Sequence, residues 1–262
     1  MSQLQKKTEI TRLERLSSDI IRITLDSPEV AQIAKPGQFV MVSAGKGKDP
    51  LLRRPFSISQ VYNNRYFQLL FKVVGQGTSL LAHCREGEYL SVLGPLGSGF
   101  QIDCTGINCL VGGGMGIAPI LFLGKWMARK CPENPPLVVI GARTEAELAP
   151  LVKDFAEIGL SVHAATDDGS LGHHGFVTDV LKNLNLDTGS KAYVCGPYPM
   201  MLAVHLFCKE KGFSCQVSME TSMACGMGAC LGCIVPVEKG GYAHACFDGP
   251  VFDAEELLWE VK

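Results

Sequence analysis

Four cysteines near the C-terminus have a spacing that suits redox chemistry. Cys225, Cys230 and Cys233 stand in a C-x4-C-x2-C pattern, and Cys246 follows after a gap. Plant-type [2Fe–2S] clusters are held by four thiolates at this spacing. The pattern therefore predicts a centre that transfers single electrons, with these four cysteines as its ligands.

The residues between these cysteines suit a tight loop. Gly226, Gly228 and Gly232 accept positive φ and leave room for backbone amides to point at the sulfurs. We expect Cys246 to arrive from the far side of a hairpin that turns at residues 240–241. The alternatives are a structural zinc site or buried thiols without a ligand. A zinc ribbon prefers two C-x2-C pairs, and this stretch has one.

A second group of glycines, Gly112, Gly113, Gly114 and Gly116, separates an apolar run from an amphipathic stretch. In a strand–turn–helix unit, such glycines let backbone N–H groups and a helix N-terminus approach a pyrophosphate. This predicts a dinucleotide site. The spacing departs from the strict G-x-G-x-x-G, so a glycine-rich turn that serves close packing alone is the alternative.

A Cys-Gly-Pro turn, Cys195, Gly196 and Pro197, follows the last strand expected in the central part of the chain. Ligands of open α/β sheets bind at the carboxyl ends of strands. Cys195 is therefore a candidate to face a nicotinamide. A small residue at the edge of a sheet is the competing interpretation.

A third motif opens a strand with Arg54, Pro55, Phe56 and Ser57. An Arg pairs with a pyrophosphate, and a Ser hydroxyl can hydrogen-bond the polar edge of a flavin ring while the Phe packs nearby. Alone, the motif is no more than an ordinary strand start. The motif becomes informative through the order of motifs along the chain, because it is followed by the sequence GQGT at residues 75–78, the glycine loop and the Cys-Gly-Pro turn.

The composition is that of a folded chain without strong charge bias. Its 262 residues are 47% hydrophobic and 19% charged, with a net charge of −2. This allows a sizeable core and gives no reason to expect nucleic acid or an acidic membrane as partner. The N-terminus lacks the apolar region of a secretory signal, and glycines interrupt the most apolar stretch, residues 109–124, so we expect no membrane span.

The chain has eleven cysteines. Without a secretory signal the reducing cytoplasm is the expected location, and clustered cysteines there indicate metal or redox work. Most of the seven outside the cluster motif are expected to be ordinary small buried residues. These seven are Cys84, Cys104, Cys109, Cys131, Cys195, Cys208 and Cys215.

Three stretches must position these motifs, giving a multi-domain β plus α/β fold. Residues 1–102 show short alternating runs separated by turn residues such as Asn63 and Asn64, typical of an antiparallel barrel. A helical turn should begin after Gly77, with Thr78 as its cap. Residues 103–213 alternate apolar runs with helical patterns, as in a parallel α/β sheet. Residues 214–262 are too few for a core of their own and form the cluster-binding part.

The expected elements have the following bounds. Strands of the barrel are predicted over residues 20–25, 38–42, 56–61, 66–74 and 88–93. The central part is predicted to have strands over residues 108–111, 137–140, 161–165 and 192–194, and helices over residues 118–129, 145–158, 175–181 and 199–211.

This order of motifs resembles the ferredoxin–NADP reductase superfamily. There a six-stranded flavin barrel carries R-x-[YF]-S and G-x-G-T/S, and a nucleotide domain carries GG-x-G-[IL]-[AT]-P and C-G-P. The resemblance covers almost the whole chain. The tail narrows it to the electron-transfer subunits of bacterial dihydroorotate dehydrogenase type B, because residues 223–233, MACGMGACLGC, are close to the motif of those subunits.

The resemblance implies site residues. FAD would be held in the barrel by the strand-opening motif and by residues of a later strand and helix start, and NAD(H) would dock on the glycine loop and the Cys-Gly-Pro turn. The FAD residues so implied are Arg54, Pro55, Phe56, Ser57, Leu70, Phe71, Lys72, Gly77 and Thr78, and the NAD residues are Gly112, Gly113, Gly114, Gly116, Cys195, Gly196 and Pro197.

The resemblance also implies a partner. The cluster would face a catalytic subunit whose FMN oxidises dihydroorotate, in a dimer of heterodimers. Electrons would pass from that FMN through the [2Fe–2S] cluster and FAD to NAD+, in UMP synthesis. A flavin is needed because it exchanges both single electrons and hydride. The alternatives are a reductase subunit of another NAD(P)H-linked ferredoxin- or sulfide-oxidising complex, and a zinc-stabilised binding module without a redox role.

The residues expected beside the adenosine ribose favour NAD over NADP. The relevant stretch is residues 166–169, TDDG, where NADP-linked members usually place Ser and Arg. The carboxylates of Asp167 and Asp168 would repel a 2′-phosphate but accept hydrogen bonds from ribose hydroxyls. Arg143, expected nearby, leaves the preference open.

Overall fold

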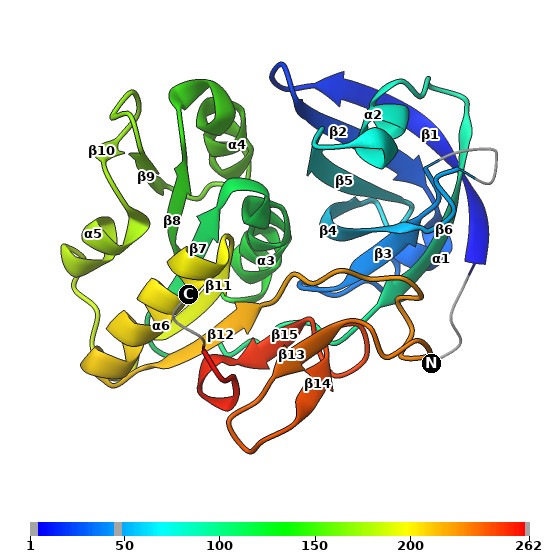
Figure 1. Ribbon diagram of the computed structural model, residues 1–262. Coiled ribbons are helices and arrows are strands. Elements are labelled where there is room, and N and C mark those ends of the chain that lie inside the picture. Colours follow the sequence, from blue (N-terminus) through cyan, green and yellow to red (C-terminus); the bar gives the residue numbers. More distant parts are fainter. Residues whose placement is uncertain (1–4, 45–48, 260–262) are drawn as a thin grey trace.

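The structure, a computed structural model, describes residues 5–44 and 49–259. A β-barrel and a sheet flanked by helices lie side by side, and a small cysteine-bearing segment lies beneath both (Figure 1). None of the helices in the described ranges is long and apolar enough to cross a membrane.

Six antiparallel strands close the predicted barrel, in the order β1-β2-β5-β4-β3-β6. Alternate residues point inward, as in β2, where Ile21, Ile23 and Leu25 are at most 1% exposed. These side chains fill the barrel with an apolar core. The strands are β1 (Gln5–Arg15), β2 (Ile20–Asp26), β3 (Phe39–Val42), β4 (Arg54–Tyr62), β5 (Tyr66–Lys72) and β6 (Tyr89–Leu96).

The barrel departs from the sequence-based prediction in three places. Strand β1 and the short helix α1 (Pro28–Ala31) were not predicted, while the hairpin at Asn63 and Asn64 is confirmed by φ values of 50° and 52°. Helix α2 spans Gln76–Ala82, so the predicted start after Gly77 is wrong. Thr78 is not the N-cap residue. It lies within the first turn, where its hydroxyl accepts a hydrogen bond from the Gly75 N–H at 3.1 Å.

The central part contains a seven-stranded sheet in the order β10-β9-β8-β7-β11-β12-β15. Neighbouring strands are parallel, except that β15 runs antiparallel to β12. Its strands are β7 (Asn108–Gly113), β8 (Leu137–Ala142), β9 (Val162–Thr166), β10 (His173–His174), β11 (Lys191–Cys195), β12 (Ser214–Ser218) and β15 (Val251–Asp253).

Helices cover both faces of this sheet, which explains why all six residues of β7 are buried. One core contains side chains of α3 and α4, and another contains side chains of α5 and α6. The four predicted helices are confirmed, with ends shifted by one or two residues. They are α3 (Ile117–Lys130), α4 (Glu145–Glu157), α5 (Val177–Lys182) and α6 (Tyr198–Lys211).

The cysteine-bearing segment is built into the sheet. Strands β12 and β15 both come from beyond residue 213, so the sheet continues across the expected boundary between the second and third parts. Between them lies the predicted hairpin of β13 (Ile234–Pro236) and β14 (Tyr242–His244). The division of the chain into 1–102, 103–213 and 214–262 stays a prediction.

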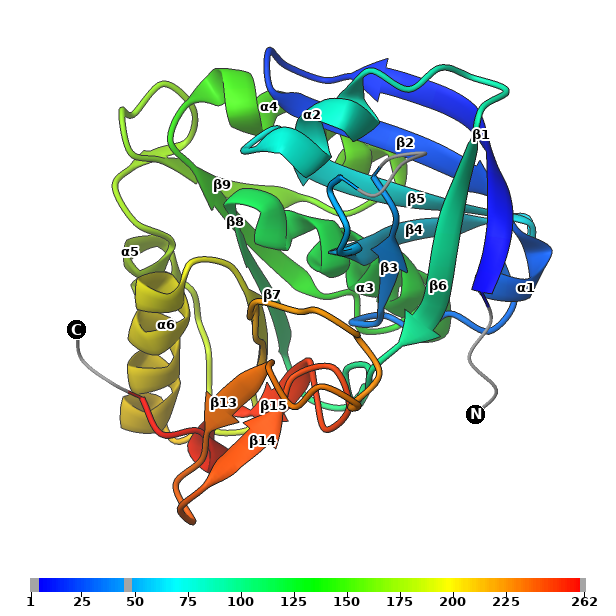
Figure 2. The same ribbon diagram turned by 45° about the vertical axis from the view of Figure 1, so that its right-hand side comes forward.

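One apolar core joins all three parts of the molecule. It contains Met41 from the barrel, Val194 from the sheet, and Cys233 and Phe252 from the cysteine-bearing segment. Figure 2 shows the hairpin and β15 below the junction of barrel and sheet. A segment too small for a core of its own is thus stabilised by packing against both larger parts.

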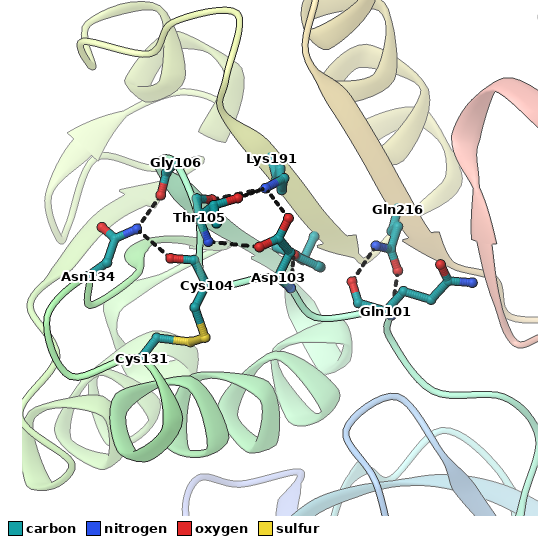
Figure 3. Close-up of polar contacts among 10 residues, drawn as sticks. Gln101, Asp103, Cys104, Thr105, Gly106, Cys131, Asn134, Lys191 and Gln216 are labelled. Carbon is teal, nitrogen blue, oxygen red and sulfur yellow. Dashed lines mark hydrogen bonds and ion pairs between the residues drawn. A yellow bond between two sulfur atoms is a disulfide. The ribbon is translucent and has the colours of Figure 1, made fainter.

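The connection from the barrel to the sheet is fixed to the sheet side (Figure 3). Gln101 exchanges two hydrogen bonds with the Gln216 side chain, at 2.9 and 2.7 Å, and Asp103 pairs with Lys191 at 2.6 Å. A disulfide joins Cys104 to Cys131 at the end of α3.

The prediction that most of the seven scattered cysteines are ordinary buried residues is confirmed, with Cys104 and Cys131 as exceptions because they form a disulfide. Cys104 is an exposed residue of the connecting segment, and both sulfurs are in the disulfide. Four of the seven fit it in full. These buried free thiols are Cys109, Cys195, Cys208 and Cys215.

Candidate functional site

The four cysteines predicted as cluster ligands lie in two pairs. The sulfurs of Cys233 and Cys246 are 3.1 Å apart, and both residues are buried. The Cys225 sulfur accepts a hydrogen bond from the backbone N–H of Cys230 at 3.4 Å. Cys225 is half-buried and Cys230 is exposed, so one pair lies inside the fold and the other near its surface.

Backbone amides point at these sulfurs. The N–H groups of Met227 and Gly228 donate to the sulfurs of Cys225 and Cys246, at 3.4 and 3.1 Å. Burial raises the pKa of the Cys225 thiol, but the hydrogen bonds from Met227, Cys230 and Ala229 outweigh burial and bring that pKa down to about 6. The loop therefore stabilises thiolate, the form in which cysteine binds metals.

The donor set fits a two-iron cluster better than a zinc ion. Within residues 5–44 and 49–259, no three His, Cys, Asp or Glu side chains converge on a point that would hold one metal ion. A structural zinc needs four ligands around a single ion. Four thiolates share two irons in a [2Fe–2S] cluster. Two cysteine pairs with amides directed at the sulfurs match that requirement.

The loop reaches this shape through left-handed residues, and one of them was mispredicted. Gly226 and Gly228 have φ of +73° and +81°, as expected. A side chain on Gly226 would also place its Cβ 2.4 Å from Cγ of Met41 in the barrel. Gly232 is not left-handed. That conformation falls on Leu231, with φ of +55°, so the assignment of positive φ to Gly232 is wrong.

A cavity of about 510 Å³ lies between the barrel and the sheet, within the size range of small-molecule sites. Every residue predicted to hold FAD lines it. These are Arg54, Pro55, Phe56, Ser57, Leu70, Phe71, Lys72, Gly77 and Thr78. The sequence thus brings residues of β4, β5 and α2 to one wall of a single cavity.

The barrel wall has an apolar floor and a basic rim. The rings of Phe56 and Phe71 pack with centroids 5.2 Å apart. The Arg54 side chain lies across the start of α2, because a Cβ on Gly77 would be only 2.9 Å from its Nε. An apolar surface beside a guanidinium suits a flavin ring carrying a pyrophosphate, so these residues fit FAD.

The glycine loop lies where it was predicted, between β7 and α3. Three of its glycines are closely packed. A Cβ on Gly113 would meet the Met200 sulfur at 2.4 Å, and one on Gly116 would meet the Cys195 carbonyl oxygen at 2.3 Å. A Cβ on Gly112 would lie 3.0 Å from Cγ1 of Ile117. Gly114 has φ of +53°, and a Cβ added there would meet nothing within 4 Å. The packing interpretation therefore accounts for three glycines, and Gly114 alone offers open backbone.

The same packing brings the Cys-Gly-Pro turn against the glycine loop. A Cβ on Gly196 would be 3.1 Å from the backbone of Gly113, and β7 and β11 are adjacent parallel strands. Cys195 is 1% exposed and is absent from the residues that line the cavity, and burial raises the pKa of its thiol. Its role beside a nicotinamide stays a prediction.

The predicted ribose-binding residues follow β9. Asp168 accepts hydrogen bonds from the backbone and hydroxyl of Ser170, at 3.0 and 2.6 Å, and these bonds lower the pKa of its carboxyl. Arg143 is paired with Glu147. The Asp168 carboxylate therefore stabilises the turn after β9. Asp167 is exposed, and its carboxylate is the one predicted to accept hydrogen bonds from a ribose.

Sequence reasoning missed the opposite wall of the cavity. It is formed by Met115 and Ala118 at the start of α3, by the four residues at the end of β12, and by two residues of the cysteine-bearing segment. The last six are Ser218, Met219, Glu220, Thr221, Met223 and Pro250. The available signal was that β12 ends at the same edge as the other parallel strands, where ligands bind.

Three family models match three successive segments of the chain. Residues 7–100 match the oxidoreductase FAD-binding domain, and residues 110–206 match the oxidoreductase NAD-binding domain. Residues 220–258 match the iron–sulfur cluster binding domain of dihydroorotate dehydrogenase B. The barrel wall of the flavin cavity, the glycine loop and the cysteine pairs each fall within the segment that matches the corresponding domain.

One solved structure is similar over nearly the whole chain. It is the structure described as "Insights into flavin-based electron bifurcation via the NADH-dependent reduced ferredoxin-NADP oxidoreductase structure", and it matches with a TM-score of 0.83 and 33% identity over 96% of this chain and 90% of that one. A ferredoxin reductase of carbazole 1,9a-dioxygenase has the same fold, with a TM-score of 0.68 and 23% identity over 81% of this chain and 67% of that one.

Curated relatives match from end to end. The dihydroorotate dehydrogenase B (NAD(+)) electron transfer subunit of Desulforamulus reducens is 40% identical over 90% of this chain and 91% of its own length. The subunit of the same name from Geobacillus sp. WCH70 is 38% identical over 97% of this chain and 98% of its own. The chain therefore belongs to the family of dihydroorotate dehydrogenase B electron transfer subunits.

Proposed function

We propose that this chain passes electrons released by dihydroorotate oxidation in a separate catalytic subunit to NAD+. One observation carries the proposal: the flavin cavity is walled by all three parts of the molecule. Arg54 belongs to the barrel and Met115 to the nucleotide part, while Met223 lies two residues before the first cluster cysteine, Cys225. The residues assigned to FAD, NAD(H) and the cluster therefore meet at one junction.

Each residue set has a separate task in this proposal. The residues that line the barrel wall of the cavity hold FAD, with Arg54 at the pyrophosphate and Ser57 at the polar edge of the ring. Gly114 and the Cys-Gly-Pro turn receive NAD(H). The ligands of the [2Fe–2S] cluster are Cys225, Cys230, Cys233 and Cys246. The bound flavin supplies the exchange between single electrons and hydride.

The surface around the cluster suits a protein partner. Leu231, Ile234, Tyr242 and Phe247 are 60%, 47%, 64% and 69% exposed, and they lie on the cluster loop and the β13–β14 hairpin. Exposed apolar and aromatic residues on the segment that carries the exposed Cys230 are typical of an interface. We assign this surface to the FMN-containing catalytic subunit, in a dimer of heterodimers. Because NAD(H) is the cosubstrate, we expect the protein to work in the cytoplasm.

Co-expression with a candidate catalytic subunit tests the proposal. The expected result is a complex with FMN, FAD and iron that forms NADH when dihydroorotate is added. In the complex carrying Cys230→Ala, this activity should be lost while NADH still reduces the retained FAD. Full dihydroorotate-linked activity in that variant would contradict the relay.

A second function is favoured by one observation, the 33% identity to the NADH-dependent reduced ferredoxin–NADP oxidoreductase structure over 96% of this chain. This chain would then be the reductase component of another complex and would use the same sites. Purification from the native organism separates the two. Recovery with an FMN protein that oxidises dihydroorotate supports the first function, and recovery with a larger iron–sulfur flavoprotein supports the second.

A further inference from the structure

One disulfide involves neither the residues that line the flavin cavity nor the cluster cysteines. It joins Cys104, in the segment that connects barrel and sheet, to Cys131, the residue that follows α3. The two ends of the bond differ in access, since Cys104 is exposed whereas Cys131 is 4% exposed. A thiol from solution therefore reaches this bond at Cys104.

A single residue, Asn134, holds the backbones of both cysteines. Its backbone N–H donates to the Cys131 carbonyl at 3.0 Å. Its side-chain amide donates to the Cys104 carbonyl at 3.1 Å and also to the Gly106 carbonyl (Figure 3). These hydrogen bonds do not involve sulfur, so they can keep Cys104 beside Cys131 after the disulfide opens.

Lys191 of β11 holds the residues on either side of Cys104. Its ammonium group pairs with the Asp103 carboxylate at 2.6 Å and donates to the carbonyl and hydroxyl oxygens of Thr105, at 3.0 and 2.8 Å. Reduction should therefore leave two thiols side by side on an ordered backbone. A disulfide re-forms readily from such an arrangement, because the reacting sulfurs are already positioned.

An exposed disulfide differs chemically from a buried structural one. Structural disulfides typically resist reduction by glutathione, whereas exposed ones exchange with thiols more easily. Disulfides of cytoplasmic proteins are usually transient, and the cytoplasm is where we expect this protein to work. The exposed Cys104 and the backbone support from Asn134 and Lys191 therefore favour a bond that opens and closes over one that stays closed.

We propose that Cys104 and Cys131 form a reversible exchange site for a low-molecular-weight thiol of the glutathione type. In the first step the thiolate of that thiol attacks the Cys104 sulfur, the bond between the protein sulfurs breaks, and Cys131 leaves as a thiolate that takes up a proton. A second thiol molecule then attacks the mixed disulfide on Cys104. The products are two protein thiols and one disulfide of the co-reactant, so two electrons pass to the cystine.

Closure is the reverse reaction, in which the Cys131 thiolate displaces the bound thiol from Cys104. Exchange thus makes and breaks the covalent tie between the end of α3 and the segment that connects barrel and sheet. The inference rests on the proposed function only for the cellular compartment.

Redox titration of the purified protein, with its flavin and cluster bound, tests the exchange. Oxidised and reduced protein are each equilibrated without urea or oxygen in mixtures of reduced and oxidised glutathione. Free thiols are then alkylated, and peptide mass spectrometry gives the oxidised fraction of Cys104 and Cys131. Both starting points should reach the same fraction, which should fall as the share of reduced glutathione rises. A bond that stays closed in excess reduced glutathione, or that does not re-form after reduction, would overturn the proposal.

Single variants identify the sulfur that is attacked. With oxidised glutathione, Cys131→Ser should form a mixed disulfide on Cys104 at least about tenfold faster than Cys104→Ser forms one on Cys131. Equal rates would overturn the assignment of Cys104 as the attacked sulfur.

A third variant tests the positioning role of Asn134. Asn134→Ala should slow closure from the mixed disulfide by about tenfold and change the rate of opening by less than about twofold. Asn183→Ala is the matched control and should leave both rates unchanged, because the Asn183 amide donates to the Asp179 carbonyl at 3.0 Å at the end of α5. Equal slowing of opening and closure in Asn134→Ala would overturn this role. These experiments need no catalytic subunit, so a failure of dihydroorotate-linked activity rejects the proposed function alone.

Discussion

The ammonium nitrogen of Lys125 lies 3.7 Å from the centre of the Tyr62 ring. It also donates a hydrogen bond to the Gln60 side chain at 2.8 Å. Lys125 belongs to α3 and the other two residues to β4, so the contact joins the nucleotide part to the barrel. Nearby, Arg22 and Asp154 form an ion pair across the same interface. Charged side chains therefore join the two parts that wall the flavin cavity.

The Lys125 contact predicts a pH-dependent stability. Burial lowers the pKa of Lys125 from 10.5 to about 8. Between these values the unfolded chain holds a proton that the folded chain has released, so folding becomes more favourable as pH rises. Relative to Lys125→Met, the wild type should gain stability between pH 8 and pH 10.5.

Urea midpoints of the wild type and Lys125→Met at pH 7 and pH 10 measure this effect, because other titrating groups cancel in the difference. Lys130→Met, on the exposed end of the same helix, is the control and should show no such trend. A difference that does not vary with pH would show that the ammonium group is not buried between the two parts.

Much of the site could be predicted because its chemistry needs particular residue types at fixed spacings. The cysteine spacing, the Arg54 motif and the glycine loop all depend on short-range geometry, and each lies where it was expected. The spacing of apolar residues likewise predicted most strands, through apolar runs and alternation, and all four helices of the central part, through helical periodicity.

The missed features depend on contacts between distant segments. Strand β1 is mostly polar, with Thr8 and Ile10 as its buried residues, so its sequence alone shows little strand pattern. The pairing of Cys104 with Cys131 cannot be deduced from spacing. Glu220 was overlooked because residues beyond 213 were assigned to the cluster part, although β12 completes the edge of the sheet that binds ligands.

We expect iron binding to depend on the backbone conformation at Gly226. Gly226→Ala should cost about 1–2 kcal/mol for the left-handed backbone, and its Cβ would also clash with Met41 at 2.4 Å. We expect loss of most of the bound iron with FAD retained, measured by iron content and visible spectra. Gly240→Ala is the matched control, since Gly240 has φ of +82° and open space. Equal iron loss in both variants would mean that the contact with Met41 is unimportant.

We expect Asp167 to determine the preference for NADH over NADPH. Because Asp168 is held by Ser170, the exposed Asp167 carboxylate is the one expected to repel a 2′-phosphate. Asp167→Ser should raise the ratio of NADPH to NADH rates at least about tenfold, equivalent to about 1.4 kcal/mol. Asp168→Asn, which disturbs the turn without removing the Asp167 charge, should leave the ratio nearly unchanged. Steady-state rates with both nucleotides decide the matter, and an unaltered ratio in Asp167→Ser contradicts the assignment.

We expect the purified protein with the Cys104–Cys131 disulfide intact to be more stable than the same protein after this bond is reduced. The bond closes a loop with a sequence separation of 27 residues, for which cross-linking typically stabilises the folded state by about 2–4 kcal/mol. A phosphine reductant should lower the urea midpoint of the wild type, measured by the fluorescence of Trp126 on α3.

The double variant Cys104→Ser and Cys131→Ser should start at the lower midpoint and not respond to the reductant. Thiol titration of the urea-unfolded chain gives the independent check, since two additional thiols should appear after reduction. Identical thiol counts before and after reduction would show that the two cysteines are not joined, and the midpoint of the wild type should then be insensitive to the reductant.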